Sequence, residues 1–350
     1  MSGFGKIWER IQRGRPPVGQ TPGDVVFREN KWSLVRYRPK ATPSGLPVLL
    51  VPSLINRNYV LDLLPGRSFV EYLVEAGHDV FMIDWGTPGP EDRYLGFETY
   101  VERYLGRAVR QTAKLAGAEK VHLLGYCLGG TLTTLYAAQH PEHIASMVAL
   151  AAPIRFHDSG LLSIWTRTKN FDVGALVEAF GNVPSQLLQA SFQLLKPTLN
   201  LSKLVSLIER SEDDDFLDAF FATETWGYDN VPFPGGAYRR YVEELYRGDA
   251  LIRGEFFLSG RPVRLESIHF PTLAVTFEHD HIVPTASASI LLERISSVAK
   301  QHLHLQGGHV GAVVAKKARA TLWSKVSEFY RQHDERPPKR RSPKKPVAEA

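Results

Sequence analysis

One short stretch of this chain limits its fold more than any other. The only cysteine, Cys127, stands in the segment Gly125-Tyr126-Cys127-Leu128-Gly129. The apolar run KVHLLGY precedes the cysteine, and the helix-like run TLTTLYAAQH follows it. These runs predict a strand, a sharp turn and a helix, with a thiol at the apex. The glycines are expected where a side chain would collide with the packed strand and helix.

The pattern Gly-x-nucleophile-x-Gly between a strand and a helix is the nucleophile elbow of α/β-hydrolases, here with cysteine in place of serine. The rest of the chain has a matching rhythm, in which short apolar runs alternate with helical runs of 10–20 residues. We therefore predict an α/β-hydrolase-like, mostly parallel sheet with helices on both faces. The expected strands are two runs within 24–38 on either side of a turn at 29–31, then 47–52, 79–83, 121–124, 146–151, 272–277 and 302–305.

A segment without strand-like runs interrupts this rhythm between the sixth and seventh strands. Residues 155–255 contain helix-like runs such as PSQLLQASFQLL and DDDFLDAFFATETW. Insertions at this place in the fold usually form a cap over the active site, so we expect a helical cap above Cys127. The predicted organisation is a core of 1–154 and 256–333, a cap subdomain of 155–255 and a disordered basic tail of 334–350.

Charge and composition narrow the class of protein. The net charge is +5, and residues 331–350 alone carry seven Lys/Arg against three Asp/Glu, so the body is close to neutral. A basic tail could touch an anionic surface or simply aid solubility, and we expect no nucleic-acid binding.

No apolar run approaches the roughly 20 residues that cross a bilayer, and the N-terminus does not resemble a secretory signal. We expect a cytoplasmic protein without a transmembrane segment.

An elbow nucleophile needs a base and a group that orients the base. In this fold the chain order is nucleophile, acid, histidine, each on a loop after a strand. Asp280 follows the run TLAVTF, and His309 follows HLHL in Gly-Gly-His-Val-Gly. Because parallel strands end at one edge of the sheet, we expect Cys127, Asp280 and His309 to meet there as a catalytic triad.

Each member of this triad has a competitor. Cys127 could be an inert buried thiol, although its place between glycines at a turn argues against that. Glu278 competes with Asp280 as the acid, and His302 and His304 compete with His309. His279 and His281 flank the acid, but two histidines without a third partner are weak evidence for a metal. We predict neither a metal site nor a cofactor.

The expected chemistry follows from the thiol. A free thiol has a pKa of about 8.5 and needs an imidazole to become a thiolate at neutral pH, which assigns that task to His309. Asp280 would orient the imidazole or assist a proton transfer itself. The oxyanion donors would be the backbone N–H of Leu128 and that of Ser53 or Leu54, since Pro52 has no N–H. A thiol that accepts an acyl group from a thioester keeps that group activated, which favours acyl transfer from a coenzyme A thioester.

Several motifs together resemble those of poly(3-hydroxyalkanoate) synthases. The central one is the Gly-x-Cys-x-Gly-Gly box at 125–130, and the likeness runs from about 22 to 330. The chain resembles the short catalytic subunit of the two-subunit class III enzymes. The further matching motifs are 52–57 with Tyr59 and 61–63, Asp84-Trp85-Gly86, 181–184, 195–197, Trp226 with Asp229, 280–284 and 307–311.

This resemblance implies an acyltransferase that polymerises (R)-3-hydroxyacyl-CoA into a polyester and releases coenzyme A. It implies that Cys127 carries the acyl group, that His309 is its base and that Asp280 activates the 3-hydroxyl of the incoming unit. It also implies contact with the growing polyester chain and the granule surface, a homodimer and a second synthase subunit. The alternative on the same fold is a thioesterase or polyester depolymerase with a cysteine nucleophile.

Overall fold

The computed structural model describes residues 3–334, which include one large, mostly parallel β-sheet. Its eight strands lie in the order β1-β2-β4-β3-β5-β6-β9-β10, and only β1 and β2 run antiparallel to their neighbours. The α/β class and the parallel sheet are thus confirmed. The strands are β1 (Gly23–Glu29), β2 (Trp32–Tyr37), β3 (Val48–Val51), β4 (Val80–Asp84), β5 (Val121–Tyr126), β6 (Ile144–Leu150), β9 (Thr272–Phe277) and β10 (Lys300–Leu305).

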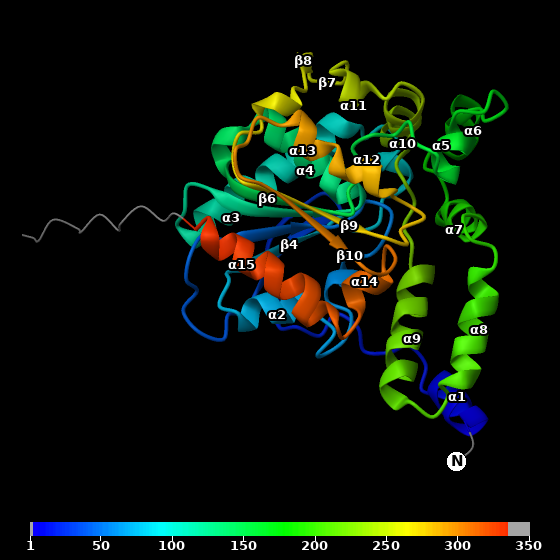
Figure 1. Cartoon of the computed structure of the whole chain (residues 1–350). Coiled ribbons are helices and arrows are strands. Elements are labelled where there is room, and N and C mark those ends of the chain that lie inside the picture. The colour runs from blue at the N-terminus through cyan, green and yellow to red at the C-terminus, as the bar shows by residue number, and fades with distance from the viewer. Residues whose placement is uncertain (1–2, 335–350) are drawn as a thin grey trace, which may run out of the picture.

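Helices cover both faces of this sheet (Figure 1). The central strands β3 and β5 are buried along their whole length, which explains why they are continuously apolar rather than alternating. One face packs against α3 and α4, and the other packs against α2 and α15. The core helices are α2 (Phe69–Glu75), α3 (Gly106–Ala116), α4 (Leu128–Gln139), α12 (Thr285–Ser289), α13 (Leu291–Arg294), α14 (Gly311–Val314) and α15 (Ser324–Gln332). Short 3₁₀ turns span Asn58–Leu61, Pro90–Asp92, Pro141–His143 and Leu265–Ser267, and wider helical turns span Thr99–Leu105, Tyr241–Arg247 and Arg319–Trp323.

The segment between β6 and β9 begins with a run of helices. Figure 1 shows α5 to α9 along the side of the core toward which the arrow of β10 points. A small hairpin of β7 (Phe257–Leu258) and β8 (Arg261–Pro262), which the sequence did not reveal, leads back to the core. The helices are α5 (Leu161–Thr166), α6 (Val173–Phe180), α7 (Ser185–Leu194), α8 (Leu199–Glu209), α9 (Asp214–Tyr228), α10 (Gly235–Arg240) and α11 (Ala250–Arg253).

Both ends of the described region make contacts with the rest of the protein that the sequence analysis did not predict. Helix α1 (Gly3–Gln12) lies against α9, where Arg10 pairs with Asp214 and Asp218. Asp334 accepts a hydrogen bond from the backbone of Leu46 at 2.6 Å, and the rest of the predicted tail lies outside the described residues. Across residues 3–334, no helix combines the length and apolar character that crossing a bilayer requires.

The elbow joins β5 to α4 through close backbone contacts. Cys127 has φ 54° and ψ −127°, a strained conformation for a residue with a side chain. A Cβ on Gly129 would stand 2.1 Å from the carbonyl oxygen of Val51, and one on Gly125 would stand 2.4 Å from the Cα of Gly130. The expected steric role of the glycines is therefore confirmed, and the helix starts directly beside the end of β3.

Replacing Gly129 by alanine should destabilise the protein even though alanine favours helices. The added Cβ meets backbone atoms of β3 that cannot move aside without shifting the sheet, so we expect a loss of about 2 kcal/mol or more in unfolding free energy. Urea unfolding measures the change. Gly227→Ala in α9 is the matched control, because a Cβ there meets nothing within 4 Å. Equal stability of the two variants would contradict the close approach.

Candidate active site

Cys127 lines a cavity between the core and the helices of segment 155–255. The cavity measures about 480 Å³, within the usual range of small-molecule sites. Its walls include Ile55, Cys127 and His309 from the core and Phe192 and Trp226 from α7 and α9. The thiol is therefore partly exposed to a shaped cavity rather than sealed in the core.

Asp280 and His309 form a buried hydrogen-bonded pair beside this thiol. The imidazole Nδ1 lies 2.7 Å from Oδ2 of the carboxylate, and both side chains are almost fully buried. The other carboxylate oxygen accepts hydrogen bonds from the backbone N–H groups of Ile282 and Val283 at 2.9 and 2.8 Å. The loop after β9 thus fixes the carboxylate, and the carboxylate fixes the imidazole.

Tyr126, the residue before the nucleophile, holds His309 from a second side. Its hydroxyl donates to the backbone carbonyl of His309 at 3.1 Å, and its ring stacks on the imidazole with centroids 5.3 Å apart. The side chain is fully buried, and burial raises the pKa of its phenol well above the usual value. Sequence reasoning missed this positioning role, because Tyr126 occupies the variable position of the elbow pattern.

The electrostatics of the three groups favour a charged imidazole. Burial by itself would lower the pKa of His309, but the Asp280 carboxylate and the Cys127 thiol together raise it to about 10. Burial would likewise raise the pKa of Asp280, yet the positive imidazole and the hydrogen bonds to the carboxylate lower it. The arrangement can therefore hold a proton on His309 next to the sulfur.

The competing residues lie outside this group. Glu278 is exposed and bonds to the side-chain amide of Gln306. His302 and His304 lie on β10, where both imidazoles bond to the hydroxyl of Thr276. His279 and His281 line the cavity, but neither forms a hydrogen bond or ion pair with the carboxylate of Asp280. Only His309 joins the acid to the thiol.

The expected oxyanion donors lie at the junction of β3 and α4. Leu128 is the first residue of α4, and Ser53 and Leu54 follow β3 in a buried loop. The close approach at Gly129 brings this loop next to the start of the helix. Trp85, after β4, donates its indole N–H to the carbonyl of Pro52 at 2.9 Å and so fixes the loop.

The same loop continues into a contact with the end of α9. Asn56 pairs with Asn230 in an isolated bridge, and Val231 donates to the carbonyl of Ile55 at 3.0 Å. The indole of Trp226 donates to the carbonyl of Arg57 at 2.8 Å. We call these contacts between 55–59 and 226–231 the loop–cap tether.

Asp229 is the charged centre of the loop–cap tether. Its carboxylate accepts from the hydroxyl of Tyr59 at 2.9 Å and pairs with the guanidinium groups of Arg57 and Arg15. Burial would raise the pKa of Asp229, but these hydrogen bonds and charges lower it. The tether therefore links the N-terminal segment, the loop after β3 and the helical segment at one carboxylate.

Comparison with known proteins places this geometry in a family. Residues 47–316 match the model of the alpha/beta hydrolase fold, and residues 11–73 match that of the N-terminus of poly-beta-hydroxybutyrate polymerase (PhaC). The poly(3-hydroxyalkanoate) polymerase subunit PhaC of Allochromatium vinosum is 33% identical, over 89% of this chain and 89% of that protein. The chain belongs to the poly(3-hydroxyalkanoate) polymerase family. The resemblance inferred from the motifs is thus confirmed.

Other relatives in the polymerase family differ in length. The PhaC subunit of Haloferax mediterranei is 36% identical over 91% of this chain, which spans 65% of that protein. Solved structures show the fold at lower identity. The monoglyceride lipase of Saccharomyces cerevisiae covers 91% of this chain with a TM-score of 0.56 and 12% identity, and the Paleococcus ferrophilus monoacylglycerol lipase covers 87% with a TM-score of 0.52 and 19% identity.

Replacing Asp280 by asparagine should lower the pKa of His309. The change removes the negative charge that most strongly raises this pKa and keeps the size of the side chain. NMR titration of histidines labelled at Cε1 would measure the shift. The matched control is Glu278→Gln, which removes an exposed acid from the same loop. An unchanged His309 titration in Asp280→Asn would contradict the electrostatic coupling.

The same substitution should change how stability depends on pH. A pKa raised from 6.5 to about 10 stabilises the folded state fully below about pH 6.5, and this contribution disappears as the pH rises through about 10. The difference in unfolding free energy between the unsubstituted chain and Asp280→Asn should therefore shrink between these pH values. Urea unfolding at several pH values measures it.

Replacing Asp229 by asparagine should loosen the loop–cap tether. The loss of a half-buried charged acceptor should cost about 1–3 kcal/mol and speed hydrogen exchange in 55–59. Asp218→Asn is the control, because its ion pair with Arg10 lies on the exposed part of α9 and should matter by less than about 1 kcal/mol. Equal exchange rates in the two variants would show that Asp229 does not hold the loop.

Proposed function

We propose that this chain polymerises (R)-3-hydroxyacyl-CoA into a polyhydroxyalkanoate and releases coenzyme A through a covalent acyl-cysteine. The observation that carries the proposal is the position of Cys127: at an elbow, on the wall of the cavity, and beside a histidine that an acid orients. Membership of the polymerase family supports the choice of polymer chemistry over other reactions of this fold. In this proposal Cys127, Asp280 and His309 are the catalytic residues.

Acyl loading begins when His309 takes the proton of the Cys127 thiol, which leaves a thiolate beside a charged imidazole. The thiolate sulfur then attacks the thioester carbonyl of the substrate. The negative oxygen then receives hydrogen bonds from the N–H of Leu128 and that of Ser53 or Leu54. The bond to the coenzyme A sulfur breaks, His309 returns its proton to that sulfur, and a new thioester remains on Cys127.

Elongation requires a 3-hydroxyl group to attack an acyl thioester. His309 removes the hydroxyl proton as the ester bond forms, the bond between the acyl carbon and the thioester sulfur breaks, and His309 passes the proton to that sulfur, which leaves as a thiol. Both carboxylate oxygens of Asp280 are already engaged, one by two backbone N–H groups and the other by His309. This favours a role for Asp280 in orienting and charging the imidazole over a role as a separate base.

The helices of 155–255 act as a cap subdomain in this proposal. The core comprises 1–154 and 256–333. An acyl-cysteine waiting for a hydroxyl acceptor survives only where water is kept out, and α7 and α9 form walls of the cavity at Cys127. The loop–cap tether would hold this cover against the oxyanion loop. A cap that excludes water also distinguishes a synthase from a thioesterase or depolymerase on the same fold.

The proposal includes partners and a location. We propose a cytoplasmic homodimer that works with a second synthase subunit at the surface of polyester granules. Two helices at the end remote from the sheet expose apolar side chains that such contacts would cover. These side chains are Phe4, Trp8 and Ile11 on α1, and Leu201, Leu204, Val205 and Ile208 on α8.

Incubation with (R)-3-hydroxybutyryl-CoA tests the proposal. We expect free coenzyme A together with insoluble polymer, and an acyl adduct that mass spectrometry assigns to the only cysteine. Cys127→Ser should lose about 100-fold or more in rate, because a serine hydroxyl is harder to ionise and its ester is a poorer acyl donor. Coenzyme A release with only monomeric hydroxy acid would instead establish a hydrolase, and full activity in Cys127→Ser would refute the acyl-cysteine.

A further inference from the structure

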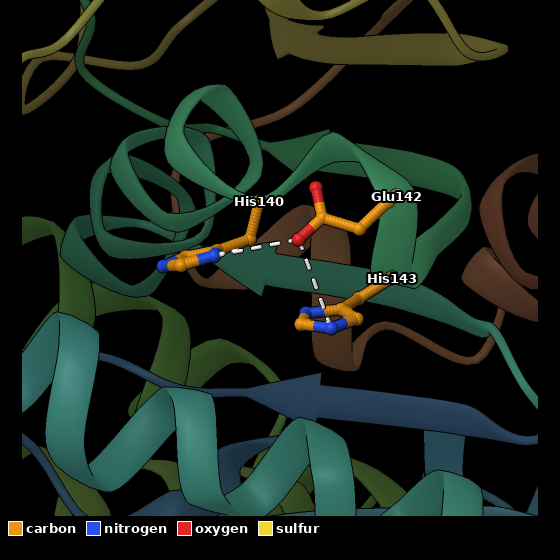
Figure 2. Close-up of side chains that lie close together, drawn as sticks. All are labelled: His140, Glu142 and His143. Atoms are coloured by element: carbon orange, nitrogen blue, oxygen red, sulfur yellow. Dashed lines mark ion pairs between the residues drawn. The ribbon is translucent and has the colours of Figure 1, made fainter.

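A group of side chains that can act as metal ligands lies far from Cys127. Helix α4 begins just after the nucleophile and ends at Gln139, so its length separates the two places by about 18 Å. His140 follows the helix, and a 3₁₀ turn of Pro141, Glu142 and His143 leads into β6. Figure 2 shows the carboxylate of Glu142 between the rings of His140 and His143.

The distances in this group suit a metal ion. One oxygen of Glu142 lies 3.6 Å from Nδ1 of His140 and 3.7 Å from Nε2 of His143. All three atoms lie within 4.8 Å of one another. Around a tetrahedral zinc ion with bonds near 2.1 Å, the ligand atoms stand about 3.4 Å apart. Side-chain rotations that shorten each separation by ~1.4 Å or less would therefore bring the three atoms to the distances of zinc ligands.

The surroundings orient one ligand as metal sites do. The hydroxyl of Tyr136, one turn back on α4, lies 2.8 Å from Nδ1 of His143, which leaves Nε2 of that ring to face Glu142. The rings of His140 and His143 stack with planes 16° apart, so their shared orientation is fixed by packing. Backbone bonds from His140 to Tyr136 and from His143 to His140 hold the turn.

We propose that His140, Glu142 and His143 form a structural binding site for a zinc-class divalent transition-metal ion. Two imidazole nitrogens and one carboxylate oxygen are ligands that suit zinc and its neighbours, and water would complete the coordination. The half-exposed side chains leave an entry path from solvent. The ion would join the end of α4 to the start of β6 and take no part in chemistry at Cys127. It would revise the sequence-based expectation of no metal site.

A coordinating site differs from an acidic surface patch in which cations it binds. The guanidinium groups of Arg110 and Arg261 act electrostatically on Tyr136 and His140, so the site is not simply an acidic patch that attracts any cation. Binding must therefore depend on coordination by all three side chains. Mg²⁺, which prefers oxygen ligands, should not compete.

The test measures metal binding by the full chain with Cys127 alkylated, because the thiolate could itself bind zinc. Titration with Zn²⁺ should show one ion per chain and a rise in the unfolding temperature. Co²⁺ should give visible bands of a nitrogen- and oxygen-ligated ion. Glu142→Gln and His140→Gln should each weaken binding by about tenfold or more, and Glu142→Gln should fold normally because its side chain is 62% exposed.

The matched control is His302→Gln on β10, where two histidines lie close together but do not belong to a metal-competent group of three among residues 3–334. This variant should bind Zn²⁺ as the unsubstituted chain does. The proposal is overturned if no saturable Zn²⁺ binding occurs, if Glu142→Gln binds with unchanged affinity, or if His302→Gln removes the binding. Because the readouts are affinity and unfolding temperature, failure here leaves the proposed polymerase activity untouched.

Discussion

Helix α4 meets the ends of β3 and β6 with its backbone, and this contact fixes the position of Cys127. Alanine at Gly129 would put a Cβ 2.1 Å from the carbonyl oxygen of Val51, and one at Gly130 would meet Ala152 at 2.3 Å. Because the helix starts so close to the sheet, the chain must turn within one residue, and Cys127 takes a left-handed conformation. The thiol then projects from the sheet edge, and Leu128 at the start of α4 lies beside the loop after β3.

The buried pair of Asp280 and His309 is the second constraint, and it depends on the first. Removing one partner of a buried ion pair leaves an unpaired charge, so the pair persists only where both groups are held firmly. Two backbone N–H groups hold Asp280, and Tyr126 holds His309 by its ring and hydroxyl. Tyr126 lies one residue before Cys127, so the elbow that presents the sulfur also sets the place of the His309 imidazole.

The helical segment 155–255 is not an independent lid resting on the core. Asp229 contacts Arg15, Arg57 and Tyr59 at the end of α9, close to the loop after β3. A movement of α9 would therefore strain the loop that begins at Ser53. This coupling gives one physical route by which occupation of the cavity can affect the geometry at Cys127.

The sequence alone determined the fold class, and it predicted that Asp280 and His309 lie near Cys127, because chain order and strand ends obey general rules of parallel sheets. It did not determine the roles of Tyr126 and Asp229 or the cluster at His140. The first lies at a variable position of the elbow pattern, the second gathers groups from distant parts of the chain, and the third depends on how a helix end and a turn aim their rings. Side-chain directions and long-range neighbours arise only when the elements pack, so the tertiary structure alone decided them.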